Sequence, residues 1–168
     1  MTAAGYGNAA LTLMLWSLLV LPASTEGQDN SISHYPVVQA RAVDGDTVEA
    51  RLSLGFGIEL AGVRIRIVGV DAAETRGGDA DLRAHGEEAK RYTAAWIEGC
   101  SSLVVMILDE DGGFGRRLGD LLCANRRLGA DLLLERLALP YDGAVDRESL
   151  EPEHRANAAW RRQRESAR

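Results

Sequence analysis

The chain has 168 residues, a net charge of -6 and an isoelectric point near 5.1. This length predicts one domain with short extensions, and the apolar and charged fractions of 46% and 26% are those of a globular protein. The acidic balance argues against a broadly basic nucleic-acid-binding surface, but it allows a small local basic cleft.

The first 25 residues carry no charged side chain and contain an apolar run from residue 10 to residue 21. Small residues around Ala23 follow the run, as in a secretory signal peptide. The segment before the run lacks the usual Lys or Arg, and the uncharged stretch is long enough for an uncleaved membrane anchor. We therefore predict that residues 1–25 are a signal peptide or anchor and that residues 26–36 are a linker. The protein is then exported (periplasmic or secreted) or membrane-anchored through residues 10–21, and a disordered tail is the remaining alternative.

Alternating apolar residues and turn signals predict three consecutive strands. The pair Asp44-Gly45 is a hairpin signal, and Gly55-Phe56-Gly57 breaks the chain before the third strand. The three predicted strands are Val37–Val43, Asp46–Leu52 and Ile58–Val70.

Helical and strand patterns then alternate along the chain. A polar segment at 77–86 is predicted as a loop, and an apolar stripe of Ala89, Tyr92 and Trp96 predicts a helix from Glu87 to Glu98. The remaining predicted elements are strands Leu103–Leu108 and Leu118–Ala124, a helix at Asp131–Leu137, a turn at 139–143 and a surface helix at Glu151–Arg164.

Five short strands with a helix between the third and fourth predict a small closed or partly closed barrel. This is the OB-fold, an α+β architecture here because of the added helices. We place the barrel domain at residues 37–143 and a C-terminal helix and tail at residues 144–168.

Three charged side chains stand out near the end of the third predicted strand. Arg66 lies on the strand, and Asp71 and Glu74 follow where the chain leaves the sheet. One cation and two carboxylates from a single stretch could hold a phosphate and a metal ion together. A surface strand with a charged exit loop explains the same residues. This stretch alone does not decide between a phosphate and metal site and such a surface strand.

Two further polar residues are not explained by periodicity. Asp46 follows the hairpin turn at the start of the second strand, and Arg116 follows Phe114-Gly115 at the start of the fifth. Taken singly, Asp46 could cap the turn, Arg116 could be exposed and Glu74 could cap a loop amide. Taken together with the preceding stretch, these residues form an ordered set along one five-strand pattern.

The order and spacing of this set resemble the staphylococcal (micrococcal) nuclease family, also called thermonucleases. The resemblance covers roughly residues 37 to 143. It implies an OB-type barrel with three helices, a monomer, and calcium-dependent hydrolysis of DNA and RNA. By the same resemblance, the Asp46 and Asp71 carboxylates and the Ala72 backbone carbonyl are ligands of Ca²⁺, a hard cation that takes oxygen ligands.

The resemblance also assigns the catalytic groups. Glu74 is the implied general base for the attacking water, and Arg66 and Arg116 are the implied phosphate-binding arginines. Tyr141 lies near the place where the family keeps nucleotide-binding tyrosines, so it is a candidate for stacking on a base, with a structural turn tyrosine as the alternative.

The chain departs from the family pattern at several positions. Ala73 stands where the family often has proline, and Gly113 and Phe114 stand where the staphylococcal enzyme has a lysine and a tyrosine that contact phosphate. Ala73 loosens the loop slightly, and the changes at Gly113 and Phe114 weaken the expected contacts to the terminal phosphate but not the expected hydrolysis. Two other functions stay open: a catalytically silent barrel of the same family that binds nucleic acid or protein, and a membrane-anchored barrel that makes a surface interaction. The five intact side chains favour the enzyme.

The two cysteines lie at matching ends of two predicted strands. Cys100 precedes the fourth strand and Cys123 ends the fifth, so an antiparallel hairpin would bring them together. Export would supply an oxidising compartment. We predict a disulfide between them, with two buried free thiols as the alternative.

Overall fold

A computed structural model describes residues 32–77, 79–109 and 115–167. The predicted signal or anchor segment, most of the predicted linker, and Gly113 with Phe114 lie outside the described residues. Among the described residues, no helix is long and apolar enough to span a membrane.

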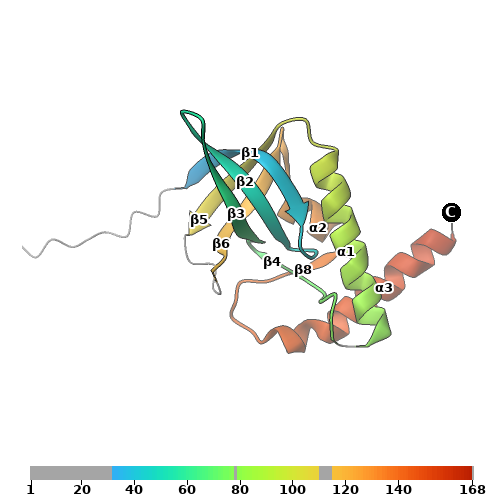
Figure 1. Ribbon diagram of the computed structural model, residues 1–168. Coiled ribbons are helices and arrows are strands. Elements are labelled where there is room, and N and C mark those ends of the chain that lie inside the picture. The colour runs from blue at the N-terminus through green and yellow to red at the C-terminus, as the bar shows by residue number, and fades with distance from the viewer. Residues whose placement is uncertain (1–31, 78, 110–114, 168) are drawn as a thin grey trace, which may run out of the picture.

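Five strands form a closed mixed barrel, which three helices accompany on one side (Figure 1). Neighbouring strands pair antiparallel in the order β3-β2-β1-β5-β6, and a parallel pairing of β3 with β6 closes the barrel. The predicted α+β class with an OB-like barrel is confirmed at this level. The barrel strands are β1 (Ser33–Ala42), β2 (Thr47–Gly55), β3 (Ile58–Ile67), β5 (Leu103–Asp109) and β6 (Arg117–Cys123).

Three short strands complete the sheets. Strand β7 (Arg126–Arg127) extends the barrel sheet beside β6, and β4 (Val70–Ala72) pairs antiparallel with β8 (Ala138–Pro140). The predicted third strand therefore ends early, because Gly69 adopts a positive φ of 77° and turns the chain between β3 and β4. The predicted turn at 139–143 begins as β8, and β1 begins at Ser33 rather than at Val37.

Helix α1 (Ala80–Glu98) begins seven residues before the predicted start, so the predicted loop at 77–86 was wrong. The Asp79 side chain caps the helix by accepting a hydrogen bond from the Leu82 amide, at 2.9 Å. The polar composition of this segment suggested a loop, but its Gly86 lies buried within the helix, where the absence of a side chain permits close packing. Helix α2 (Leu128–Leu134) likewise begins three residues before the predicted start.

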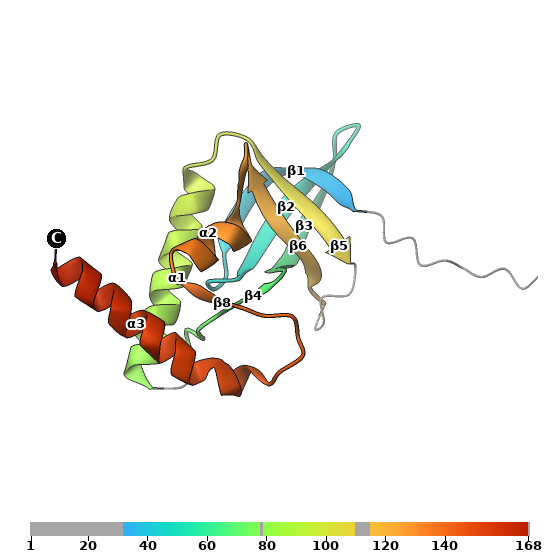
Figure 2. The same ribbon diagram turned by 180° about the vertical axis from the view of Figure 1, so that it is seen from behind.

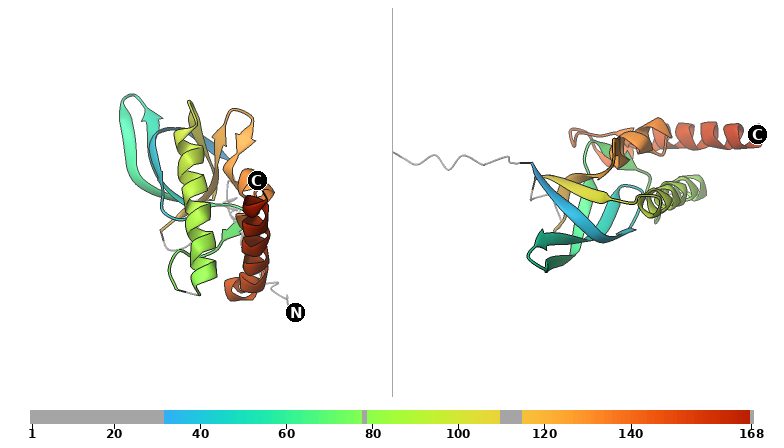
Figure 3. Two further views of the ribbon diagram at one scale, coloured as in Figure 1. Left: turned by 90° about the vertical axis from the view of Figure 1, so that its right-hand side faces the viewer. Right: turned by 90° about the horizontal axis from the view of Figure 1, so that it is seen from above.

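Helix α3 (Glu151–Ser166) follows a 3-10 turn, η1 (Arg147–Leu150), and it is more than the predicted surface helix. Figure 3 shows α3 running beside α1, with which it is in contact. Its His154 and Ala158 are buried. Arg161 donates to Glu88 of α1 at 2.6 Å, so charged contacts also join the two helices.

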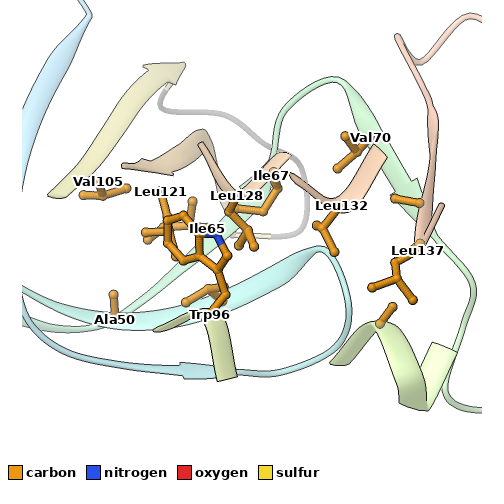
Figure 4. Packing of buried hydrophobic residues seen from close by; sticks show 14 of the residues in the cluster. Ala50, Ile65, Ile67, Val70, Trp96, Val105, Leu121, Leu128, Leu132 and Leu137 are labelled. Atoms are coloured by element: carbon orange, nitrogen blue, oxygen red, sulfur yellow. The ribbon is translucent and has the colours of Figure 1, made fainter. Parts of the chain in front are cut away.

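The core fills the barrel and continues under the helices (Figure 4). Trp96 from α1 packs into it as predicted, and the Trp96 indole N–H donates to Asp131 of α2 at 2.7 Å. The apolar contacts and this hydrogen bond hold two helices against one end of the barrel. The labelled core residues are Ala50, Ile65, Ile67, Val70, Trp96, Val105, Leu121, Leu128, Leu132 and Leu137.

A disulfide joins Cys100, just before β5, to Cys123 at the end of β6. Leu103 pairs with Cys123 in the antiparallel ladder, which brings the two cysteines together with Cα atoms 5.9 Å apart. The bridge closes a loop with a sequence separation of 23 residues.

Replacing both cysteines by serine is expected to lower the free energy of unfolding by about 3 kcal/mol, because the unfolded chain regains the freedom of that loop. Urea unfolding of the two proteins, each with and without reductant, measures the difference. Reductant should destabilise the natural chain and leave the double variant unchanged. Equal stability of the natural and doubly substituted chains under oxidising conditions would contradict the expectation.

Candidate functional site

Three of the predicted site residues meet at the end of the barrel where β4 and β8 lie (Figure 2). Asp46 immediately precedes β2, Arg66 lies near the end of β3, and Asp71 is the central residue of β4. The ladder between β2 and β3 sets Thr47 opposite Arg66, and the Ile67 amide donates to the Asp46 carbonyl at 2.8 Å. Backbone pairing therefore places the arginine next to the first acid.

The Arg66 guanidinium lies between two buried carboxylates. Its NH2 is 3.0 Å from Asp71 Oδ1, and its NH1 forms an ion pair with Asp46 Oδ1. Asp46 also accepts from the Ala72 amide, at 2.6 Å, and from the Thr47 hydroxyl, at 3.3 Å. The structure thus brings together the arginine and the three residues predicted to hold a metal ion.

Glu74 lies at the rim of this group, just past β4, and its side chain is 62% exposed. Arg147 of η1 reaches it: Arg147 NH1 is 3.0 Å from Glu74 Oε1. The same guanidinium pairs through Nε with Asp71 Oδ1. Arg147 was missed by the sequence analysis, because it lies 76 residues from Asp71 and no local pattern connects them.

His154 is a second residue that the sequence analysis missed. From α3, its Nε2 lies 3.1 Å from Asp71 Oδ2, and both side chains are buried. Leu150, His154 and Ala158 are all buried and recur every four residues, the spacing of one helical face. This short stripe was the sequence signal that could have identified the buried face with His154, but the many charged residues around it made the helix resemble a surface helix.

The charges around Asp71 control its protonation. Burial alone would raise the pKa of the carboxyl, but the hydrogen bond with His154 and the positive charges of Arg147 and Arg66 outweigh burial and hold the pKa below its ordinary value. The pKa of Arg66 is lowered, first by burial and then by repulsion from Arg147, while Asp71 partly opposes the shift. Asp71 is therefore favoured in its ionised form, in a site that concentrates positive charge.

Arg116 and Tyr141 flank the group. Arg116 is partly buried just before β6, where Arg117 pairs with Ile65 in the parallel ladder, and its charge also lowers the pKa of Arg66. Tyr141 follows β8 and is partly buried, and its backbone amide donates to the Gly69 carbonyl at 3.0 Å. The charge of Arg116 thus acts on Arg66, whereas the hydrogen bond of Tyr141 to Gly69 is a backbone turn contact.

The donor set at this site suits a hard divalent cation. Asp46 and Asp71 present Oδ1 atoms to one guanidinium, so a positive group already lies between them. In the described part of the chain, no group of three or more His, Cys, Asp or Glu side chains is arranged to hold a metal ion. Calcium takes about 6–8 oxygen ligands, so these two carboxylates and the Ala72 carbonyl would share it with water and substrate.

Comparison with known proteins does not assign a family to this geometry. No protein-family model matches the chain, and no curated protein is significantly similar to it in sequence.

Helix α1 supports the site from behind through two close contacts. The Thr93 hydroxyl donates to the Gly45 carbonyl at 2.7 Å, which fastens the turn that carries Asp46. At Gly86 the helix approaches the loop after β4 so closely that an added Cβ would lie 2.5 Å from the Ala73 carbonyl oxygen. One helix thus positions both loops that carry the acids.

The substitution Gly86→Ala is expected to destabilise the protein by roughly 1–3 kcal/mol, since the added methyl meets backbone atoms that cannot rotate away. Helix propensity alone predicts the opposite sign, a gain of about 1 kcal/mol. Urea unfolding measures the change, and Ala84→Gly, at an exposed position of the same helix, calibrates the propensity effect. A Gly86→Ala protein more stable than the natural chain would contradict the close approach.

The buried His85 predicts a loss of stability in mild acid. Burial first, and then the neighbouring His154, lower the pKa of His85 to about 4. Between about pH 6.5 and pH 4 the unfolded chain therefore binds a proton that the folded chain excludes, so stability falls as the pH drops through this window. The expected loss is roughly 3 kcal/mol.

Urea unfolding at several pH values between 4 and 8 measures this slope, and His85→Leu should flatten it. Asp71 contributes a slope of the same sign, but only below the ordinary range of an Asp carboxyl, because its folded pKa is lowered. The two effects are therefore separable by pH. An unchanged slope in His85→Leu would show that the buried imidazole is not its source.

Proposed function

We propose that the protein is a calcium-dependent nuclease of the staphylococcal (micrococcal) nuclease type, an endonuclease acting on phosphodiester bonds of DNA and RNA. One observation carries the proposal: the buried Arg66 is held between Asp46 and Asp71, with Glu74 at the rim of the same group. A buried arginine with two acids is costly to maintain for stability alone, since apolar residues of similar size often serve as well or better.

Each side chain has a chemical role suited to its place. Asp46 and Asp71 would hold Ca²⁺ with the Ala72 carbonyl, and the bound ion would supply Lewis-acid polarisation of a phosphate oxygen. Arg66, fixed by two ion pairs, would present a rigid planar donor to a phosphate, and Arg116, whose charge acts on Arg66, would add a second. Glu74 is exposed enough to reach water and accept its proton.

Two further features support this assignment. The barrel is of the OB-like type that the family resemblance implies, and such barrels commonly bind nucleic acids. The Cys100–Cys123 disulfide suits an oxidising compartment, which agrees with the export proposed from the first 25 residues. We further propose that the protein acts as a monomer.

Degradation of single-stranded DNA by the purified protein tests the proposal, with calcium, with magnesium and with a chelator in parallel. We expect cleavage with calcium and none with the chelator. Folded protein that binds the DNA without cutting it under every metal condition would refute the nuclease and favour a silent binding module of the same fold.

A further inference from the structure

Arg147 contacts two of the acids that the proposed reaction needs. We propose that Arg147 is a built-in counter-ion of the metal site, which leaves Asp71 when a divalent cation binds and then holds the substrate phosphate as a third arginine. This inference rests on the proposed function. It adds to the site a residue from outside the barrel domain that the sequence predicted at residues 37–143.

One guanidinium spans the proposed metal ligand and the proposed base. Arg147 Nε pairs with Asp71 Oδ1, and Arg147 NH1 lies 3.0 Å from Glu74 Oε1. A cation bound through Asp71 Oδ1 would occupy the same oxygen, so the metal ion and Arg147 would compete for it. While Arg147 stays there, its ion pair also occupies one oxygen of Glu74.

Of the two arginines that pair with Asp71, Arg147 is the one that can move away. Asp71 Oδ1 already accepts from Arg66 at 3.0 Å, so two guanidinium groups share one oxygen and repel each other. The Arg66 side chain is 8% exposed and lies on a barrel strand, whereas the Arg147 side chain is 37% exposed on a four-residue turn. A divalent cation arriving at Asp71 adds repulsion, and the exposed side chain moves at the smaller cost in packing.

The neighbouring space can receive both the displaced side chain and a substrate. A pocket of about 360 Å³ lies between the loop after β4 and the start of α3. This volume lies within the range of ligand pockets, roughly 300–1,000 Å³. Its lining includes Arg76, Arg147 and five acidic residues, among them Asp71, Glu74 and Glu151, so a phosphate would enter it together with the bound cation.

The backbone that carries Arg147 is fixed, so the movement is confined to the side chain. Asp146 caps η1 by accepting from the Glu148 amide at 3.2 Å, and Leu150 at the end of η1 is buried. The guanidinium then stays within reach of the pocket after it leaves Asp71. A phosphate there is a suitable new partner, because guanidinium groups bind phosphate oxygens in a bidentate manner.

The substitution Arg147→Gln tests the exchange through two equilibrium measurements. Without nucleic acid, calorimetry should show calcium binding about fivefold tighter than in the natural chain, because the competing charge is gone. With saturating calcium, affinity for an oligothymidylate with cleavage-resistant phosphorothioate linkages should fall about tenfold, because one phosphate contact is lost. Arg155→Gln, on the exposed side of α3 and paired with Asp79 and Glu151, should leave both affinities unchanged.

The opposite signs distinguish this role from a structural one, since a loosened fold would weaken both affinities. Arg147→Lys keeps the charge without the bidentate fork, so it should bind calcium like the natural chain and the oligonucleotide with intermediate affinity. If the natural protein cuts DNA with calcium but Arg147→Gln binds calcium no more tightly, the inference is wrong and the proposed function stands. A natural chain that binds no calcium would overturn both.

Discussion

Replacing Glu74 by glutamine is expected to reduce the rate of calcium-dependent DNA cleavage by about 10²–10⁴-fold, the usual contribution of a well-placed general base. Glutamine keeps the size of the side chain and removes only its ability to accept a proton. Glu74 is largely exposed and lies outside the buried ion pairs of Arg66, so the fold should be unaffected. Calcium affinity should change little, because the proposed ligands are Asp46, Asp71 and the Ala72 carbonyl.

Single-turnover cleavage of a labelled oligonucleotide measures this effect, with calcium saturating in both proteins. Glu153→Gln is the matched control, since it makes the same chemical change at an exposed position of α3. The control should cleave like the natural chain. Cleavage by Glu74→Gln within a factor of about three of the natural rate would exclude Glu74 as the base.

Substituting Arg66 by methionine is expected to destabilise the protein by roughly 3–5 kcal/mol, because two buried carboxylates lose their shared positive partner. Asp46 would keep its hydrogen bonds from Ala72 and Thr47, but it would lose its ion pair with Arg66. Cleavage should also be lost, since the proposed rigid phosphate donor is gone.

Arg64 provides the control for this prediction. It lies two residues away on the same strand, its side chain is 57% exposed, and its pair with Glu49 spans 3.8 Å. Arg64→Met should change the free energy of unfolding by less than about 0.5 kcal/mol, as is usual for exposed sites. Urea unfolding of both variants makes the comparison. Equal effects of the two substitutions would mean that the buried ion pairs do not stabilise the fold.

Local pattern was sufficient to predict most of the barrel. Alternation and the Asp44-Gly45 turn located the strand that follows Asp46 and the strand that carries Arg66, because side chains in a strand alternate with a period of two. The same pattern could not show that β3 closes on β6 in parallel, since that pairing joins residues more than fifty positions apart. It also did not show the small β4–β8 sheet, whose strands have three residues each.

The C-terminal side of the site was not predictable by the same means. Arg147 and His154 reach Asp71 from a turn and a helix whose composition is that of a solvated surface. Their placement depends on α3 packing against α1, a contact between distant segments. The start of α1 was missed for a related reason: Gly86 breaks helices in isolation, and only the close approach to the Ala73 carbonyl explains its presence.

The most direct test of the proposed nuclease is to measure calcium binding and DNA cleavage on the same protein over the same range of calcium concentrations. If Asp46 and Asp71 hold the catalytic ion, cleavage should rise with calcium occupancy, reach half its maximum at the same concentration, and stop when a chelator is added. Cleavage that persists in the chelator, or full calcium occupancy with no cleavage at all, would contradict a calcium-dependent nuclease at this site.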